Sequence, residues 1–144
     1  MEQRIQIDKT EPKAFEGMFT LENYLTRSSI AKQHKNLIKL RASQINGCSF
    51  CINMHTNEAL KSGENQQRLF LLNAWKESGL FSEEESVILQ MTEEITMIHE
   101  KGLTSETYHK ATQIFQENYI AQIIMTIVTI NAWNRIAVAT RKPI

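Results

Sequence analysis

Apolar residues recur at three- and four-residue spacings along the whole chain, which is the pattern of amphipathic helices. The sequence has no alternating runs of Val, Ile and Thr of the kind that form strands. Only two prolines and five glycines interrupt the pattern. It therefore predicts an all-α fold, a bundle of about seven helices.

Capping and helix-ending residues divide this pattern into segments. Glycines follow several apolar stretches, at the position where a left-handed residue ends a helix, and Ser82 with Glu85 has the spacing of a capping box. The expected helices span Pro12 to about Leu25, residues 30–46 after a cap at Ser28 or Ser29, residues 48–62, 66–78, 83 to about 101, 105–115, and Asn118 to Thr140.

The last expected helix is apolar on nearly all sides. Its residues 119–139 read YIAQIIMTIVTINAWNRIAVA. A small monomer does not easily cover such a helix, so we expect a homo-oligomer whose subunits bury it. The alternative is the central core helix of a monomeric bundle. The amides of this segment and Arg135 argue against a membrane span.

Length and composition are those of an ordinary soluble domain. At 144 residues the chain, residues 1–144, is expected to form one domain. Lys and Arg balance Asp and Glu at 16 each and are scattered among them, so no nucleic-acid partner is expected. The N-terminus lacks the apolar stretch of a secretory signal, and no run of about 20 apolar residues is present. We therefore expect a cytoplasmic protein without a membrane partner.

Both cysteines of the chain lie in the stretch CSFCINMH, residues 48–55. If this stretch is helical, Cys48, Cys51 and His55 fall on one stripe of the helix. In a reducing compartment a lone CxxC motif is typical of a metal site or a dithiol–disulfide pair. Two buried, unreactive thiols beside an unrelated histidine are the third alternative.

A metal site fits this spacing poorly. Along a helix axis Cys48 and His55 are about 10 Å apart, too far for both to bind one tetrahedral zinc. The remaining histidines, His34, His99 and His109, are not spaced to supply further ligands. No metal and no cofactor are therefore expected.

A reversible disulfide fits better. Residues three apart on a helix have Cα atoms about 5 to 6 Å apart, within the range that a disulfide spans. The helix N-terminus favours thiolates at both cysteines, and His55, one turn after Cys51, can accept a proton. The pattern favours a redox-active pair.

The stretch RASQINGCSFCINMH closely resembles the core motif of the AhpD-like alkylhydroperoxidases, the CxxC branch of the carboxymuconolactone decarboxylase family. Three further segments resemble that family: QRLFLLNAWKES, LFSEEESVIL and TINAWNRIAVATR. The resemblance covers most of the chain from about residue 14, with the core motif at residues 36–58. It implies an AhpD-like helical bundle that oligomerises through helices, as trimers or as hexamers built from dimers.

The resemblance also implies a thiol-dependent peroxidase, an antioxidant protein that reduces small organic hydroperoxides. One cysteine attacks the hydroperoxide, the other resolves the sulfenic acid to a disulfide, and a dithiol or a protein reductant reduces the bridge. We assign Cys51 as the peroxidatic thiol because His55, the proton relay, lies one turn away, and Cys48 as the resolving thiol. The helix terminus alone would favour attack by Cys48.

Two positions depart from the family pattern. Asn36 stands where the family relay commonly has a glutamate, and an amide cannot accept a proton. Phe50 stands where some members have a histidine, which makes the site more apolar and raises a thiol pKa. Glu58, one turn beyond His55, either orients the imidazole or is an exposed helical glutamate.

Two other functions remain open on this sequence. A lyase of the carboxymuconolactone decarboxylase type would use acid and base groups and give the CxxC motif no role. A non-catalytic oligomeric redox sensor would oxidise slowly and change an interface, and Asn36 keeps this alternative open.

Overall fold

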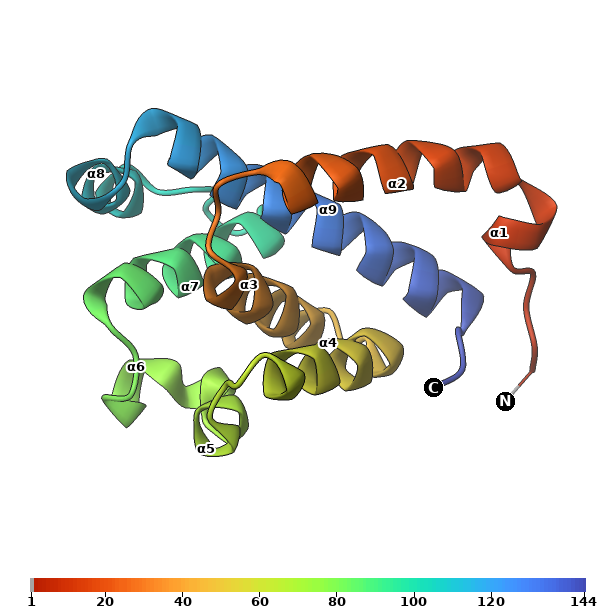
Figure 1. The fold of residues 1–144 in the computed structure, drawn as a ribbon, viewed down its shortest axis with the longest axis horizontal. Helices are drawn as coiled ribbons and strands as arrows, with labels where there is room; N and C mark the ends of the chain where they lie inside the picture. Colours follow the sequence, from red (N-terminus) through yellow and green to blue (C-terminus); the bar gives the residue numbers. More distant parts are fainter. Residues whose placement is uncertain (1) are drawn as a thin grey trace.

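The structure is a computed structural model that describes residues 2–144. Within these residues it contains helices and no strands, which confirms the all-α prediction (Figure 1). The elements in chain order are α1 (Ile7–Thr10), α2 (Pro12–Arg27), α3 (Lys32–Ile45), α4 (Ser49–Lys61), α5 (Gln66–Phe70), the 3₁₀-helix η1 (Leu72–Ala74), α6 (Trp75–Ser78), α7 (Glu83–Thr96), α8 (Ser105–Ile114) and α9 (Glu117–Thr140).

Helix α3 lies at the centre of the bundle and packs against α4, α7 and α9. Its apolar residues face two ways. Ile38 and Ala42 join a core with residues of α7, α8 and α9, whereas Leu37 and Leu40 join a second core with residues of α4, α7 and the 66–78 region. Because both faces of α3 are buried, its polar positions are fixed relative to α4 and α9.

Helix boundaries differ from the predicted ones in three places. The predicted helix over residues 66–78 is divided into α5, η1 and α6. Helix α7 ends at Thr96 instead of about Lys101, and turns occupy the next residues. The division of the 66–78 segment and the extra one-turn helix α1 account for the larger number of elements. The capping box of Ser82 and Glu85 at the start of α7 is confirmed.

The predicted serine cap of α3 is wrong. The N-cap residue is Ala31, which makes no side-chain cap bond. The Ser28 hydroxyl instead donates to Leu25 O at 2.7 Å, and the Ser29 hydroxyl donates to Gln122 Oε1 at 3.1 Å. Ser28 therefore closes the last turn of α2, and Ser29 links the segment after α2 to α9.

Helix α9 runs through the molecule beside α2 and α3 (Figure 1). Its Ile123, Ile127 and Ile130 are buried in the core, yet Val128 and Val138 are 44% and 48% exposed. By length and composition α9 could cross a membrane, but 44% of its apolar window is already buried within the chain, as in a core helix. Whether a second subunit covers the exposed valines stays a prediction.

Candidate functional site

The two cysteines lie where α4 begins. Asn46 ends α3 and Gly47 has a positive φ of 64°, a conformation that suits glycine and turns the chain into α4. Cys48 is the N-cap of α4, and its Sγ accepts the Cys51 N–H at 3.3 Å. The two form a disulfide with Cα atoms 5.3 Å apart, and both side chains are buried. The sequence therefore correctly predicted a pair that can close locally at a helix N-terminus.

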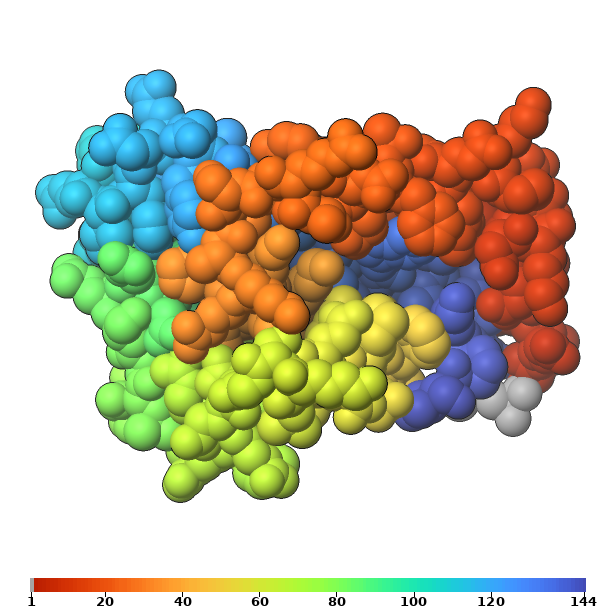
Figure 2. All heavy atoms as spheres, viewed as in Figure 1, coloured from red at the N-terminus to blue at the C-terminus, as the bar shows by residue number. Residues whose placement is uncertain are grey.

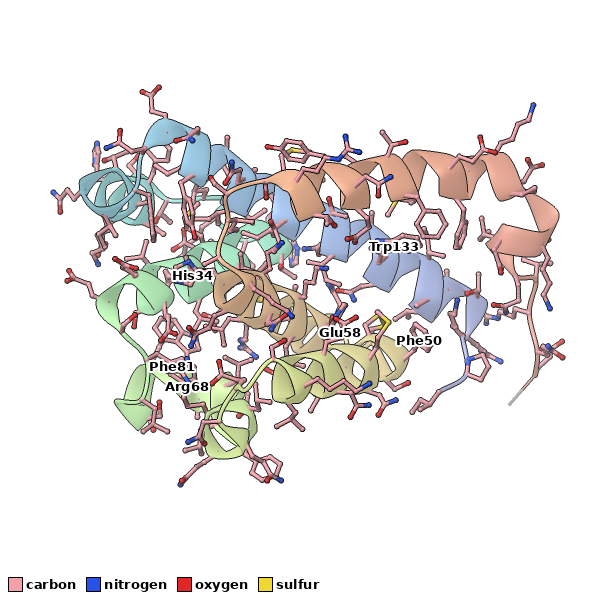
Figure 3. All side chains as sticks on the ribbon, in the orientation of Figure 1. His34, Phe50, Glu58, Arg68, Phe81 and Trp133 are labelled. Carbon is pink, nitrogen blue, oxygen red and sulfur yellow. A yellow bond between two sulfur atoms is a disulfide. The ribbon has the colours of Figure 1, made fainter. Side chains whose placement is uncertain are left out.

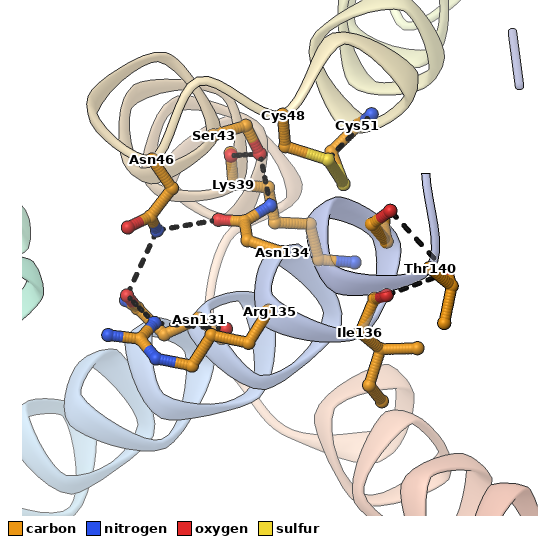
Figure 4. Close-up of a disulfide and its surroundings, with 11 residues drawn as sticks. Lys39, Ser43, Asn46, Cys48, Cys51, Asn131, Asn134, Arg135, Ile136 and Thr140 are labelled. Atoms are coloured by element: carbon orange, nitrogen blue, oxygen red, sulfur yellow. Dashed lines mark hydrogen bonds between the residues drawn. A yellow bond between two sulfur atoms is a disulfide. The ribbon is translucent and has the colours of Figure 1, made fainter. Parts of the chain in front are cut away.

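The disulfide packs on a polar cluster between the end of α3 and α9 (Figure 4). Asn46 Nδ2 donates to Asn134 Oδ1 at 2.9 Å and to Asn131 Oδ1 at 3.0 Å. Asn134 Nδ2 in turn donates to the Ser43 hydroxyl at 3.0 Å, and the Cys48 N–H donates to Ser43 O. These bonds tie the turn that carries Cys48 to α9.

His55 lies one turn after Cys51 on α4 and is only 4% exposed. Its Nδ1 is 2.8 Å from Glu58 Oε2, and because a carboxylate only accepts, Nδ1 carries the hydrogen and Nε2 keeps a lone pair. Burial lowers the pKa of His55 from its ordinary value of 6.5, and the Glu58 hydrogen bond opposes this. At neutral pH the imidazole is therefore a neutral base.

A cavity of about 300 Å³ opens between α2, α4 and α9, and Cys51 and His55 line it. In the space-filling view it is the hollow between the orange-red α2 and the yellow α4, with the blue α9 behind (Figure 2). Most of the lining is apolar: Phe15, Phe19, Phe50, Met54, Trp133, Ile136 and Ala137. Cys48 is not among the lining residues, so Cys51 is the cysteine that faces the cavity.

Besides Glu58 of α4, charged side chains from three other segments line the same cavity. Glu22 of α2 accepts the Trp133 Nε1–H at 2.8 Å and pairs with Lys39 of α3 at 3.5 Å. Lys142, which follows α9, lies over the Phe50 ring with its Nζ 4.9 Å from the ring centroid. Figure 3 shows Phe50 and Trp133 on either side of this space, with Glu58 on α4 nearby.

Asn36 lies elsewhere. It is buried on α3 but lines a separate hollow of about 290 Å³ together with residues of the turn after α4. Within residues 2–144 no hydrogen bond joins Asn36 to His55. The carboxylate that holds His55 is that of Glu58, whose side chain is 50% exposed.

The structure adds Glu22, Lys39 and Lys142 to the candidate site. No spacing within the CxxC motif signals them, because they reach the cavity from α2, from α3 and from beyond α9. In the described part of the chain no group of three or more His, Cys, Asp or Glu side chains could hold a metal ion.

This arrangement can carry out dithiol–disulfide chemistry. Both cysteines lie at the N-terminus of α4, where the helix dipole favours thiolates in the reduced state, and the Cys51 N–H donates to Cys48 Sγ. A neutral histidine lies one turn away, and the cavity admits a small apolar molecule to Cys51.

Comparisons with known proteins agree with the fold and the motif. The model of the carboxymuconolactone decarboxylase family matches residues 12–94, which include the CxxC motif and His55. The uncharacterized protein YdfG of Bacillus subtilis (strain 168) is 40% identical over 139 residues, covering 96% of this chain and 95% of the relative.

Solved structures share the whole fold. A crystal structure of a protein of unknown function from Agrobacterium tumefaciens, provisionally named as antioxidant defence protein AhpD, matches with a TM-score of 0.95 at 37% identity, covering 99% of this chain and 97% of that one. The AhpD-like fold prediction is therefore confirmed.

Two more distant structures show the same fold alone. An uncharacterized peroxidase-related protein from Silicibacter sp. TM1040 has a TM-score of 0.78 at 19% identity, covering 91% of this chain and 70% of that one. The debrominase Bmp8 has a TM-score of 0.82 at 18% identity, covering 94% and 73%. The matched family model, the close relatives and the CxxC disulfide on α4 together show that this chain belongs to the carboxymuconolactone decarboxylase family, as an AhpD-like member.

Proposed function

We propose that the protein is a thiol-dependent peroxidase that reduces small organic hydroperoxides through Cys51 and Cys48. The observation that carries the proposal is the position of Cys51, which is bonded to Cys48 at the start of α4 and lines an apolar cavity shared with His55. A buried structural disulfide would need neither the cavity nor the histidine.

In the first step the Cys51 thiolate attacks one oxygen of the hydroperoxide O–O bond. That bond breaks, Cys51 becomes a sulfenic acid, and the other oxygen leaves with the organic group as an alcohol after taking a proton. The sulfur loses two electrons and the peroxide gains them. His55 accepts the thiol proton at Nε2 and returns it to the leaving oxygen.

In the second step the Cys48 thiolate attacks the Cys51 sulfur. The S–O bond breaks, the S–S bond forms, and the oxygen leaves as water after taking up the proton that the Cys48 thiol released. The Cα atoms of the pair are 5.3 Å apart, so this step needs little movement of the helix. An external dithiol or a protein reductant then restores both thiols by thiol–disulfide exchange.

Glu58 supports the histidine in this scheme. The bond from His55 Nδ1–H to the Glu58 carboxylate leaves Nε2 as the basic atom. The role that the resemblance gave to the position of Asn36 therefore falls to Glu58, from the same helix as the cysteines. The cysteine roles remain those predicted: Cys51 attacks and Cys48 resolves.

The test is stopped-flow oxidation of the reduced protein by an alkyl hydroperoxide, with thiols counted at the end. We expect the wild type to consume two thiols per chain. Cys48→Ser should stop at a sulfenic acid on Cys51 that dimedone labels, and Cys51→Ser should react no faster than a free thiol. Attack by Cys51 is ruled out if Cys51→Ser retains the wild-type rate. Dimedone labelling of Cys48 in that variant would show that the two cysteine roles are exchanged, and a retained rate without any labelled cysteine would overturn the peroxidase proposal.

A further inference from the structure

Lys142 is an uncompensated cation at the mouth of the cavity that holds Cys51. Its Nζ lies 4.9 Å from the centre of the Phe50 ring, next to Cys51 in sequence. Among residues 2–144, including the C-terminal carboxylate, no acidic oxygen lies within 4.0 Å of this nitrogen.

The other charges at the cavity already have partners. The two carboxylate oxygens of Glu22 are taken by Trp133 and Lys39, at 2.8 and 3.5 Å. Glu58 is bonded to His55 and lies seven residues beyond Cys51 on α4, about 10 Å along the helix axis. Lys142 lies over Phe50, beside Cys51, at the start of α4. An anion bound to Lys142 is therefore at the other end of this stretch of helix from the Glu58 carboxylate.

The rest of the cavity favours an apolar molecule. Phe15 and Trp133 meet edge to face with ring centroids 5.3 Å apart, and Phe19 packs against the same indole at 5.9 Å. The volume of about 300 Å³ lies at the lower end of the range of small-molecule sites. The lining therefore combines an apolar wall, a thiol and one available ammonium group.

We propose that the cavity takes hydroperoxides with an apolar body and a carboxylate, and that the carboxylate pairs with Lys142. The inference rests on the proposed function, since Cys51 reduces the bound hydroperoxide to the alcohol by the steps given above. The carboxylate is unchanged by the reaction and serves for recognition. A peroxidised fatty acid is the chemical class that has these features.

Binding to the disulfide form tests the recognition without any turnover. The probes are octanoate and 1-octanol, titrated into the wild type, Lys142→Gln and Lys61→Gln and followed by NMR. Lys61 is an exposed lysine at the end of α4 that lines none of the cavities described, so its variant controls for the loss of one charge. We expect Lys142→Gln to weaken octanoate binding about two- to fivefold, as for an exposed ion pair, and to leave 1-octanol binding unchanged.

Kinetics provide the second readout. Reduced wild type, Lys142→Gln and Lys61→Gln are mixed with a fatty-acid hydroperoxide, its methyl ester and tert-butyl hydroperoxide. Lys142→Gln should slow only the reaction with the free acid, and the wild type should prefer the acid to the ester. Equal slowing with all three oxidants would mean that Lys142 stabilises the Cys51 thiolate instead, and it would overturn the proposal.

The two readouts separate the possible failures. If none of the three hydroperoxides oxidises the wild-type thiols, the proposed function is wrong, whereas octanoate binding still tests the site. If the hydroperoxides react but octanoate binds no better to the wild type than to Lys142→Gln, the recognition by Lys142 is wrong and the peroxidase proposal stands.

Discussion

Two clusters of ionisable side chains, one around Glu93 on α7 and one around His55 on α4, differ in how completely their hydrogen bonds are satisfied. On α7, the Glu93 carboxylate accepts from Trp75 at 2.8 Å and from Arg41 at 3.0 and 3.1 Å, and its second oxygen pairs with Lys76 at 3.1 Å. On α4, His55 has one bond, to Glu58, and its other ring nitrogen has no partner among the described residues.

The two clusters also border cavities of different character, one polar and one mostly apolar. Glu93 borders the larger hollow, about 860 Å³ between α7 and α8, which is lined largely by charged and polar residues and contains no cysteine. His55 and Cys51 border the smaller, mostly apolar cavity. Size is thus a poor guide to the reactive site: the saturated carboxylate stabilises the fold, whereas the histidine with a free lone pair beside a thiol is available for chemistry.

The pKa shifts follow from these contacts. Burial by itself raises the pKa of Glu93, but hydrogen bonds from Trp75, Lys76 and Arg41 together lower it below its ordinary value of 4.5. Burial lowers the pKa of His55, and the single hydrogen bond that it donates to Glu58 only partly opposes this shift. The first group therefore stays charged and paired, and the second stays neutral.

The strongest way to break the Glu93 cluster is Glu93→Gln. The change leaves the charges of Arg41 and Lys76 uncompensated, so the free energy of unfolding should fall by about 3 kcal/mol. Urea denaturation of the disulfide form measures it. The rate at which hydroperoxide oxidises the thiols should stay at the wild-type value.

A matched control is Glu106→Gln, which removes the exposed pair with Lys110 on α8 and should not change stability measurably. A fall in the rate of thiol oxidation in Glu93→Gln, at a temperature where the variant is folded, would show that the Glu93 cluster takes part in the chemistry.

Glu58→Gln tests the other cluster with a smaller effect. The rate of thiol oxidation should fall about tenfold, less than the factor of about 100 expected on removing a general base itself. The carboxylate also raises the pKa of His55, so its loss should move the acid limb of the pH–rate profile to lower pH. Stopped-flow rates across pH measure both effects.

Glu58→Asp and Glu16→Gln are the controls. The shorter acid keeps a charge one turn from His55 and should recover part of the rate. Glu16 is exposed on α2 and lines none of the three cavities. A lower rate with an unmoved pH profile would mean that Glu58 acts only on local structure.

Patterns of residues close together in the sequence were enough to predict most of the helices and the position of the CxxC motif. The three-to-four spacing identified the helices, and the CxxC spacing placed Cys48 and Cys51 at the start of α4, because both depend on residues close in sequence. The break of the 66–78 segment was not foreseen. There Leu69, Leu72 and Trp75 all reach one core, and tertiary packing replaces a continuous helix with short turns.

The rest of the site depends on residues far apart in sequence. Glu22, Lys39 and Lys142 reach the cavity only through the packing of α2 and α3 against α4 and the course of the chain after α9. Glu58 was visible in the sequence, one turn after His55. Whether the two side chains bond depends on their rotamers, which the sequence does not give. The family resemblance drew attention to Asn36. In the structure Asn36 lines a separate hollow, whose residues do not include Cys51 or His55.

The smallest expected effect is a two-step dependence of stability on pH. Because the pKa of His55 is lowered from 6.5, the unfolded chain binds its proton first as pH falls, and stability decreases from about pH 6.5 down to the folded-state pKa. The lowered pKa of Glu93 has the same sign, and its loss of stability begins only below 4.5.

His55→Asn should therefore flatten the dependence of the unfolding free energy on pH just below pH 6.5. Glu93→Gln should flatten it only below pH 4.5. Each unit by which folding lowers a pKa contributes about 1.4 kcal/mol. Denaturant unfolding of the disulfide forms at several pH values measures the slopes. His34, with a pKa lowered mainly by burial, keeps part of the upper slope in both variants. Identical slopes in His55→Asn and wild type above pH 4.5 would show that His55 is already solvated and that the contrast between the clusters is absent.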